Sequence, residues 1–345
     1  MRRVVVEQFG GPEVLRMVEE DAPRPGPGEV LVRVLVAGVS FTDALIRAGT
    51  YLGGPKPPFT PGYELVGVVE EVGPGTSRLR KGDRVGVLTV WGSNAELVCV
   101  PERYAVEVPD DLDPAEVVSL VFPYMTAYQM LHRAARVSRG EAVLVHGAAG
   151  RVGTAALELG ALAGLRLFGT ASARDRATVE RLGAVAIDYR TEDFLARVRE
   201  LCPDGMDVVL DGIGGAVSLR SFWALRRGDP LVGDPGGRLV VMGNYKTMVG
   251  GRKSWRGWVE WYAATGLVWL WGTLSPRRHV IAYRIQKLRI EHQDWFRQDF
   301  LALLELLRAD KIHPAVAERL PLSEARQAHE LLESTAARGK LVLVP

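Results

Sequence analysis

The spacing of the hydrophobic residues changes near residue 113 and divides the chain into stretches of different kinds. Before this point, short valine-rich runs alternate with turns of glycine and proline. Many short strands separated by such turns predict a compact β-barrel-like domain. From Asp113 the pattern becomes helical, because Asp113 can cap a helix whose first turn contains Pro114, and we expect a domain boundary here. The strands expected before it are Val4–Val6, Val30–Val36, Leu65–Val72, Arg84–Leu88 and Leu97–Val100.

Beyond this boundary, strand-like and helix-like stretches alternate. This order predicts a parallel, doubly wound sheet with right-handed crossovers. The expected helices include Ala173–Leu182, Glu192–Leu201 and the amphipathic stretch Asp294–Arg308. The expected strands are Ala142–His146, Leu165–Thr170, Val185–Tyr189, Asp207–Asp211, Gly237–Met242 and Arg278–Arg284.

The turn after the first of these strands fits the phosphate-binding corner of a dinucleotide fold. Against the pattern G-x-G-x-x-G, the three glycine positions fall on Ala148, Gly150 and Gly153. Gly150 would let the backbone approach a pyrophosphate, and Gly153 would let the next helix pack closely on the strand. Alanine in the first position weakens the match, whereas the strand before and the helix after strengthen it. An ordinary glycine-containing turn is the alternative.

The end of the second strand favours NADPH over NADH. NAD-preferring sites usually carry Asp or Glu here, on the ribose hydroxyl. This strand ends at Thr170 without a carboxylate, and Ser172, Arg174 and Arg176 follow. The two guanidinium groups can pair with a 2′-phosphate. Ser172 could also cap the next helix together with Asp175, leaving the arginines solvated, and the two roles are compatible.

Composition and charge narrow the class of protein. A chain of 345 residues is long enough for two domains, and 47% hydrophobic with 24% charged residues is typical of a soluble globular protein. The net charge of +2 gives no reason to expect a nucleic-acid partner. Cys99 and Cys202 are isolated, which suits a reducing compartment, and the first residues lack the apolar core of a secretory signal. We therefore expect a cytoplasmic protein.

Several ordered motifs resemble the zinc-independent quinone oxidoreductase branch of the medium-chain dehydrogenase/reductase superfamily. Within it, Gly169-Thr-Ala-Ser-Ala173 and Ile187-Asp-Tyr189 are most similar to the vesicle amine transport protein subgroup. The other motifs are Gly38-Val-Ser-Phe-Thr-Asp43, Arg47-Ala-Gly-Thr-Tyr51, Pro61-Gly-Tyr-Glu64, Gly67-Val-Val-Glu70, Lys81-Gly-Asp-Arg-Val85, His146-Gly-Ala-Ala-Gly-Arg-Val-Gly153 and Gly339-Lys-Leu-Val-Leu-Val-Pro345.

This resemblance implies two domains in a homodimer. Residues 120–295 would form a Rossmann domain that binds NADP, with a doubly wound parallel sheet. Residues 1–119 and 296–345 would form a GroES-like β-barrel catalytic domain.

The resemblance also implies the residues of the site. Ser40, Asp43 and Tyr51 would face the nicotinamide and the substrate, and Tyr51 could donate a hydrogen bond to the carbonyl oxygen or relay a proton. Three alternatives stay open: Ser40 replaces the usual asparagine, Tyr51 could pack on a proline-rich loop, and Asp43 could be purely structural. The implied cofactor contacts are Thr126, Ala149, Gly150, Arg151, Val152, Gly153, Thr170, Ser172, Arg174, Arg176, Tyr189, Gly243, Asn244 and Lys340.

No metal is expected in this site. In the zinc-bearing relatives a cysteine stands three positions before the motif aspartate and a histidine stands before the motif glutamate. This chain has Ser40 and Tyr63 at those positions. Serine and tyrosine are poor replacements for thiolate and imidazole, and catalytic zinc needs about three converging protein ligands. His146 has no evident partner in the sequence and is expected to be a strand residue.

Residues 254–271 are the most unusual segment, because they contain five of the eight tryptophans. The uninterrupted apolar part, Trp261–Leu274, is shorter than the roughly 20 residues that a membrane span needs. Three roles are open: an aromatic wall or lid of the substrate pocket, a subunit interface, or peripheral membrane contact through residues 255–271. In the last case Arg252, Lys253 and Arg256 would meet lipid headgroups.

Together with the resemblance, these features predict a metal-free enzyme that uses NADPH to reduce quinones or α,β-unsaturated carbonyl compounds. One alternative is an enoyl reductase acting on thioester intermediates. Another is a catalytically weak nucleotide-binding protein associated with membranes, suggested by Ser40 and by the tryptophan-rich segment.

Overall fold

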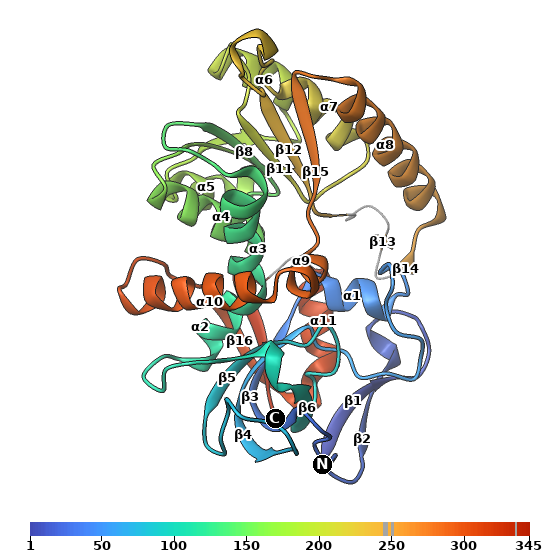
Figure 1. Cartoon of the computed structure of the whole chain (residues 1–345). Helices are drawn as coiled ribbons and strands as arrows, with labels where there is room; N and C mark the ends of the chain where they lie inside the picture. The colour runs from blue at the N-terminus through green and yellow to red at the C-terminus, as the bar shows by residue number, and fades with distance from the viewer. Residues whose placement is uncertain (244–247, 250–251, 335–336) are drawn as a thin grey trace. The chain divides into compact units, whose positions relative to one another are not determined.

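Residues 1–243, 248–249, 252–334 and 337–345 are described by a computed structural model of the chain (Figure 1). Contacts between residues divide the chain into two compact units. The first contains residues 1–125, 248–253 and 286–345, and the second contains residues 126–247 and 254–285. The predicted α/β class with a parallel sheet is confirmed. The domain boundaries expected after residues 119 and 295 stay predictions.

The first unit is built on a seven-stranded sheet. Six of its strands follow the order β16-β17-β3-β4-β5-β7, and the seventh, β6, pairs with β3. The predicted strand Val30–Val36 extends to Val39, because the last strand of the chain pairs with its end. Local spacing cannot reveal this extension, since the partner lies about 300 residues away. The strands are β3 (Glu29–Val39), β4 (Glu64–Val72), β5 (Arg84–Leu88), β6 (Leu97–Pro101), β7 (Ala105–Glu107), β16 (Val316–Pro321) and β17 (Lys340–Val344), beside the hairpin of β1 (Arg2–Val6) and β2 (Leu15–Glu19).

Helix α10 (Gln293–Arg308) confirms the predicted amphipathic stretch of the first unit. Its side chain Phe300 is fully buried and packs on Gly86 of β5. A Cβ atom at residue 86 would lie 2.7 Å from the Phe300 ring, so a side chain there would push the helix off the sheet. The other helices of this unit are α1 (Phe41–Arg47), α2 (Pro114–Ser119), α9 (Ile285–Glu291) and α11 (Ala325–Glu333).

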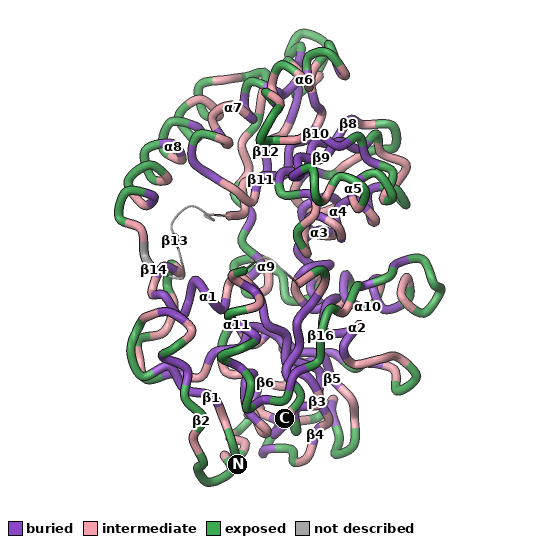
Figure 2. Tube along the Cα trace, turned by 180° about the vertical axis from the view of Figure 1, so that it is seen from behind, coloured by how far each residue is buried: buried purple, intermediate pink, exposed green. Residues whose placement is uncertain are grey.

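The second unit is a parallel sheet of six strands in the order β10-β9-β8-β11-β12-β15. The chain moves outward from β8 in one direction and from β11 in the other, so the order reverses between these two strands. All five residues of β8 are buried, as expected for a central strand covered on both faces (Figure 2). The strands are β8 (Ala142–His146), β9 (Arg166–Ala171), β10 (Val185–Asp188), β11 (Val208–Asp211), β12 (Gly237–Val241) and β15 (Arg278–Ala282); the helices include α3 (Met125–Tyr128), α4 (Arg151–Leu162), α5 (Arg176–Arg181), α6 (Phe194–Leu201) and α7 (Ala216–Ala224).

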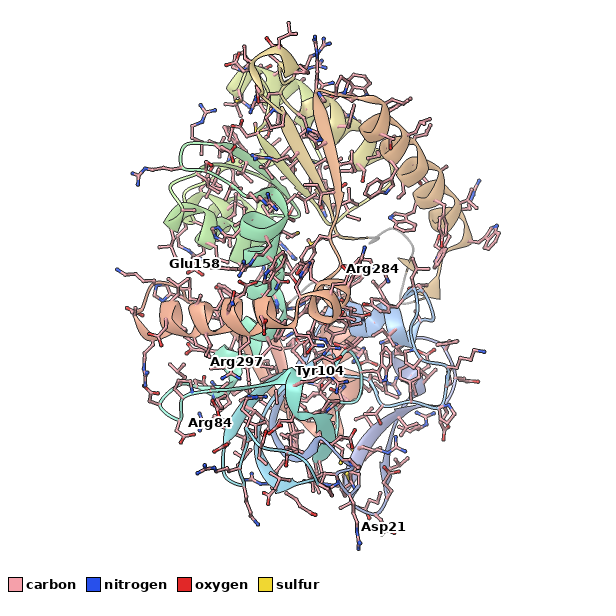
Figure 3. The ribbon with its side chains drawn as sticks, in the orientation of Figure 1. Asp21, Arg84, Tyr104, Glu158, Arg284 and Arg297 are labelled. Carbon is pink, nitrogen blue, oxygen red and sulfur yellow. The ribbon has the colours of Figure 1, made fainter. Side chains whose placement is uncertain are left out.

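The tryptophan-rich segment forms one long helix, α8 (Trp255–Leu274), at the edge of this unit. One side, including Ala264 and Val268, is buried on the unit, next to α7 and β15. Bulky side chains also project from the other side (Figure 3). Within the described part of the chain, no helix has both the length and the apolar character needed to cross a membrane. The large exposed apolar residues of α8 are Trp255, Val259, Tyr262, Leu267, Trp269, Leu270 and Leu274.

Candidate functional site

The glycine turn after β8 has the geometry of a phosphate-binding corner. The G-x-G-x-x-G template places its first glycine, which makes the sharp turn, at the position of Ala148. In this chain the preceding residue, Gly147, makes that turn with a φ of +66°. Ala148 is buried, and its N–H donates to the carbonyl of Thr170 at 3.0 Å. A Cβ atom on Gly153 would lie 2.7 Å from Ala148 Cα and closer still to Gly147 O. Alanine therefore fits the first template position because its neighbour supplies the left-handed backbone, while Gly153 must remain glycine.

The start of α4 is open to a ligand. Gly150 is the residue before the helix, and it provides no side chain to bond the first N–H groups. These groups cannot be satisfied within the helix, and the helix dipole adds positive charge at this end. Gly147 and Gly150 are both exposed on the turn. The predicted contacts Ala149, Gly150, Arg151, Val152 and Gly153 thus all lie at a helix start that fits a pyrophosphate.

The side chains of His146 and Thr170 hold this turn from the inside. Both side chains are buried, and the imidazole Nδ1 lies 3.1 Å from Thr170 Oγ1. The other ring nitrogen lies 2.9 Å from Ser221 Oγ. Burial lowers the pKa of His146, with the nearby Asp211 carboxylate opposing it. His146 is therefore a neutral strand residue, as the sequence led us to expect.

The residues predicted to hold the 2′-phosphate gather beyond the end of β9. Ser172 precedes the next helical turn but makes no side-chain cap bond to its backbone; its Oγ donates instead to Asp175 Oδ2 at 2.7 Å. Arg176 donates to Glu180 at 2.8 Å and also lines a small hollow with Ser172 and Asp188. Tyr189 is exposed, and its N–H donates to the carbonyl of Ala171, which places it next to Ser172. Arg174 is also largely exposed.

The carboxyl ends of β11 and β12 meet a tryptophan of α8. Trp261 Nε1 donates to the carbonyl of Gly243 at 3.2 Å, and its ring lies against Gly214. This is the end of the sheet at which the resemblance places the nicotinamide. Asn244, the other predicted contact here, lies outside the described residues. Thr126 of α3 has a buried hydroxyl without a hydrogen-bond partner among the described residues, which suits a residue that awaits a ligand.

Ser40 and Asp43 are joined to each other at the start of α1. Asp43 Oδ2 accepts from both the backbone N–H and the hydroxyl of Ser40 at 2.8 Å, and Oδ1 accepts from Gly62 N–H at 3.1 Å. Asp43 is fully buried, and burial together with the neighbouring Glu64 raises its pKa to about 7. Lys340 is also buried and pairs with Glu64. These contacts give Asp43 a structural task and engage the ammonium group of Lys340 with a carboxylate.

Tyr51 is oriented by a small hydrogen-bond network. Gln286 Nε2 donates to Tyr51 Oη at 2.6 Å and to Tyr63 Oη at 3.3 Å. The two hydroxyl oxygens lie 3.0 Å apart, and Tyr63 is buried whereas Tyr51 is half-buried. Burial, then the neighbouring Tyr51, raises the pKa of Tyr63 well above its usual range, so Tyr63 keeps its proton. Either hydroxyl can donate to the other, so the contact fixes the positions of the two oxygens.

Helix α9 contributes two residues that the sequence did not reveal. Gln286 belongs to the network above, and Arg289, one turn later, donates to the carbonyl of Leu88. The Arg289 guanidinium also lies 4.1 Å from the ring centroid of Tyr104, which Figure 3 labels. Burial lowers the pKa of Arg289. No motif or periodic pattern marks this short helix, so no sequence signal could have identified Gln286.

The two positions that differ from the zinc-bearing relatives are engaged in other contacts. The Ser40 hydroxyl donates to Asp43, and the Tyr63 hydroxyl belongs to the Tyr51 network. Within the ranges that the structure describes, no cluster of three or more His, Cys, Asp or Glu side chains could hold a metal ion.

Comparisons with known proteins agree with this geometry. Residues 26–110 match the family model described as alcohol dehydrogenase GroES-like domain, and residues 182–343 match the one described as zinc-binding dehydrogenase. The chain is 32% identical to the synaptic vesicle membrane protein VAT-1 homolog of Rattus norvegicus, over all of this chain and 84% of that protein. It is 30% identical to the quinone oxidoreductase of Homo sapiens, over all of this chain and 98% of that protein. The crystal structure of Escherichia coli quinone oxidoreductase complexed with NADPH has a TM-score of 0.86 and 28% identity, covering both chains completely.

Proposed function

The chain belongs to the zinc-independent quinone oxidoreductase and VAT-1 branch of the medium-chain dehydrogenase/reductase superfamily, and we propose that it reduces small quinones or α,β-unsaturated carbonyl compounds with NADPH. The observation that carries this proposal is the open start of α4 at the glycine turn. The strand beside it ends in Ser172, with Arg174 and Arg176 beyond and no carboxylate at the ribose position. The Escherichia coli relative, whose structure holds NADPH, supports the same cofactor.

NADPH supplies the hydride when it is bound, and the residues of this chain bind and orient it. We assign the pyrophosphate to the first-turn N–H groups of α4, which need no movement to receive it. We assign the 2′-phosphate to Arg174 and Arg176 near Ser172. For Arg176 this means exchanging or sharing its bond to Glu180, which is an exposed pair that costs little to break.

Tyr51 is the group that we assign to the carbonyl oxygen of the substrate. Hydride addition to a conjugated carbonyl compound places negative charge on that oxygen, and an O–H aimed at it stabilises the charge. Gln286 donates to Tyr51 Oη, and Tyr63 Oη lies 3.0 Å from it, so these two side chains hold the Tyr51 hydroxyl in place. Ser40 and Asp43 act in this proposal as positioning residues, because they fix the start of α1 and the backbone of Gly62, next to Tyr63.

NADPH consumption by the purified protein tests the proposal. The panel contains a benzoquinone, a simple enone and an enoyl thioester, with NADH as the control cofactor. Turnover of the quinone or the enone with NADPH, and slower turnover with NADH, is the expected result. Preference for the thioester would select the enoyl reductase alternative, and absence of NADPH binding would refute the whole proposal.

The exposed side of α8 supports a second proposal about assembly. In the first half of the helix, Trp255 is 73% exposed, Val259 is 54% exposed and Tyr262 is 49% exposed. Apolar surface of this extent is usually covered by a partner, so we propose a cytoplasmic homodimer that covers it. Light scattering should give twice the chain mass of 37.7 kDa. A monomer that sediments with anionic liposomes, and loses this on Trp255→Ala, would favour peripheral membrane contact instead.

A further inference from the structure

An open groove lies on the second unit where α7 ends, α8 ends and β15 begins. Its volume is about 600 Å³. Three aromatic rings form its apolar surface and three arginines line its sides. We call it the aromatic–arginine groove; these six residues are Phe222, Trp223, Trp271, Arg227, Arg277 and Arg278.

This groove is separate from the nucleotide-binding edge of the sheet. The glycine turn follows the carboxyl end of β8, whereas the groove lies beside Arg278, the first residue of β15. All six strands are parallel, so the two features lie at opposite edges. A strand of five residues separates these edges by about 13 Å. A ligand in the groove would therefore not touch the glycine turn.

The three rings make a curved apolar surface. The centroid of Phe222 lies 5.5 Å from that of Trp223 and 5.7 Å from that of Trp271, and the two tryptophans are 5.4 Å apart. Their planes are inclined to one another by 44° to 89°. Because no two of these rings are parallel, they do not form a slot in which a flat heteroaromatic ligand could stack on both of its faces. A flexible hydrocarbon chain can follow the curved surface.

The charge around the rings is positive and not neutralised. Arg278 lies over Trp223 and Phe222 at 5.2 and 5.5 Å, and burial together with Arg227 lowers its pKa. Arg227 and Arg277 are exposed, and within the described residues neither forms an ion pair. The nearby carboxylates of Asp207 and Asp234 are both paired with Arg226, which lies outside the groove. Asp229, two residues after Arg227, accepts from the N–H of Leu231. Among the described residues, no ion pair therefore engages Arg227 or Arg277.

Apolar surface continues from the mouth of the groove. Leu274 of α8 lines the groove and is 72% exposed. The loop after α7 is tied to the groove at Gly228, whose N–H donates to the carbonyl of Arg277. This loop carries Leu231, which is 93% exposed. Exposed aliphatic side chains beside a cationic groove match a ligand that has a hydrocarbon part longer than the groove itself.

We propose that the aromatic–arginine groove binds an amphipathic anion of the fatty-carboxylate type. Its hydrocarbon chain lies on the exposed parts of Trp223 and Trp271, with the buried Phe222 beneath them, and its single anionic head pairs with Arg227 and Arg277. Arg278 is held over the rings and donates to the carbonyl of Leu225, so it contributes charge without having to move. This site is independent of the proposed reductase activity.

Calorimetric titration of the purified protein with dodecanoate, kept below its critical micelle concentration, tests the proposal. Dodecanol and dodecyltrimethylammonium separate the contribution of the anionic head from that of the chain, and AMP tests a flat anion. We expect dodecanoate to bind at least about tenfold more tightly than each of these probes, because only it supplies both a chain and a charge-assisted pair with guanidinium. Equal binding of dodecanol, or tighter binding of AMP, would overturn the proposal.

Charge-reversal variants locate the site. Arg227→Glu and Arg277→Glu should each weaken dodecanoate binding at least about tenfold. Arg256→Glu is the matched control, because Arg256 is also exposed on α8 but lies about 25 Å along the helix from its last turn. Thermal unfolding by circular dichroism checks that each variant is folded. If Arg277→Glu does not fold, the test rests on Arg227→Glu. Unchanged binding in the folded groove variants, or association with anionic vesicles without binding of monomeric dodecanoate, would refute the site.

Discussion

Replacing Gly153 by alanine should separate nucleotide binding from folding. The new Cβ would lie 2.3 Å from Gly147 O and 2.7 Å from Ala148 Cα, whereas ordinary contact begins at 3.4 Å, so α4 must move away from the turn. A shift of about 1.1 Å stretches an N–H···O bond of about 2.9 Å to a length at which it no longer counts as one. Two charge-assisted bonds lost at about 1.5 kcal/mol each remove about 3 kcal/mol. The Kd for NADPH should then rise about 100-fold.

Fluorescence titration with NADPH measures this change, and a second glycine of α4 provides the control. A Cβ on Gly160 would meet the end of the Leu167 side chain, which can give way, rather than the backbone of the turn. Gly160→Ala should therefore bind NADPH within about threefold of the parent, with helix propensity offsetting part of the cost. If Gly153→Ala folds and also binds within threefold, the phosphates do not lie at the start of α4.

Further predictions concern the substrate side, pH and cofactor preference. Tyr51→Phe should lower kcat for enone reduction by about 100-fold or more, as loss of a positioned acid does, and Gln286→Leu by about tenfold, with KM for NADPH unchanged in both. The Asp43 carboxyl binds its proton more tightly in the folded than in the unfolded chain, so its contribution to the free energy of unfolding is largest below pH 3.8 and is lost as the pH rises toward about 7. Urea unfolding at several pH values should show this decline, at most about 1.4 kcal/mol per pH unit, and Asp43→Asn should flatten it; an identical slope in the variant would contradict the assignment. Arg174→Ala and Arg176→Ala should each reduce the preference for NADPH over NADH by about fivefold in kcat/KM, and a preference that stays the same in the double variant would place the 2′-phosphate elsewhere.

Local patterns predicted the cofactor half of the molecule well. The alternation after residue 113 gave the parallel sheet, and the turn from Gly147 to Gly153 has the expected strand before it and helix after it. Such features depend on residues close together in the sequence, where periodicity and turn chemistry carry the information. The left-handed backbone at Gly147, which explains why Ala148 is tolerated, required coordinates.

The substrate half could be predicted only in part. Tyr51 was implied by the resemblance, but the orientation of its hydroxyl depends on Gln286, 235 positions away. The contact between Trp261 and Gly243 likewise joins a helix to the end of a strand. One tryptophan of the segment therefore lies at the carboxyl end of the strands, while Trp255 is exposed. The tryptophan-rich segment therefore lies in two different environments, and its composition cannot show which tryptophan lies in which.

The pairing of β3 with β17 has a consequence for synthesis. Residues 29–39 leave the ribosome early, and β6 soon covers the edge of residues 29–33. The strand that covers residues 37–39, Lys340–Val344, is among the last to be made. The second unit consists of residues 126–247 and 254–285, so it is complete while the first unit still has an open edge. An unpaired strand edge is a template for association with other chains. A nascent chain stalled near residue 310 should therefore hold a folded nucleotide-binding unit, protected from protease, beside an aggregation-prone partial sheet that requires a chaperone until β17 docks.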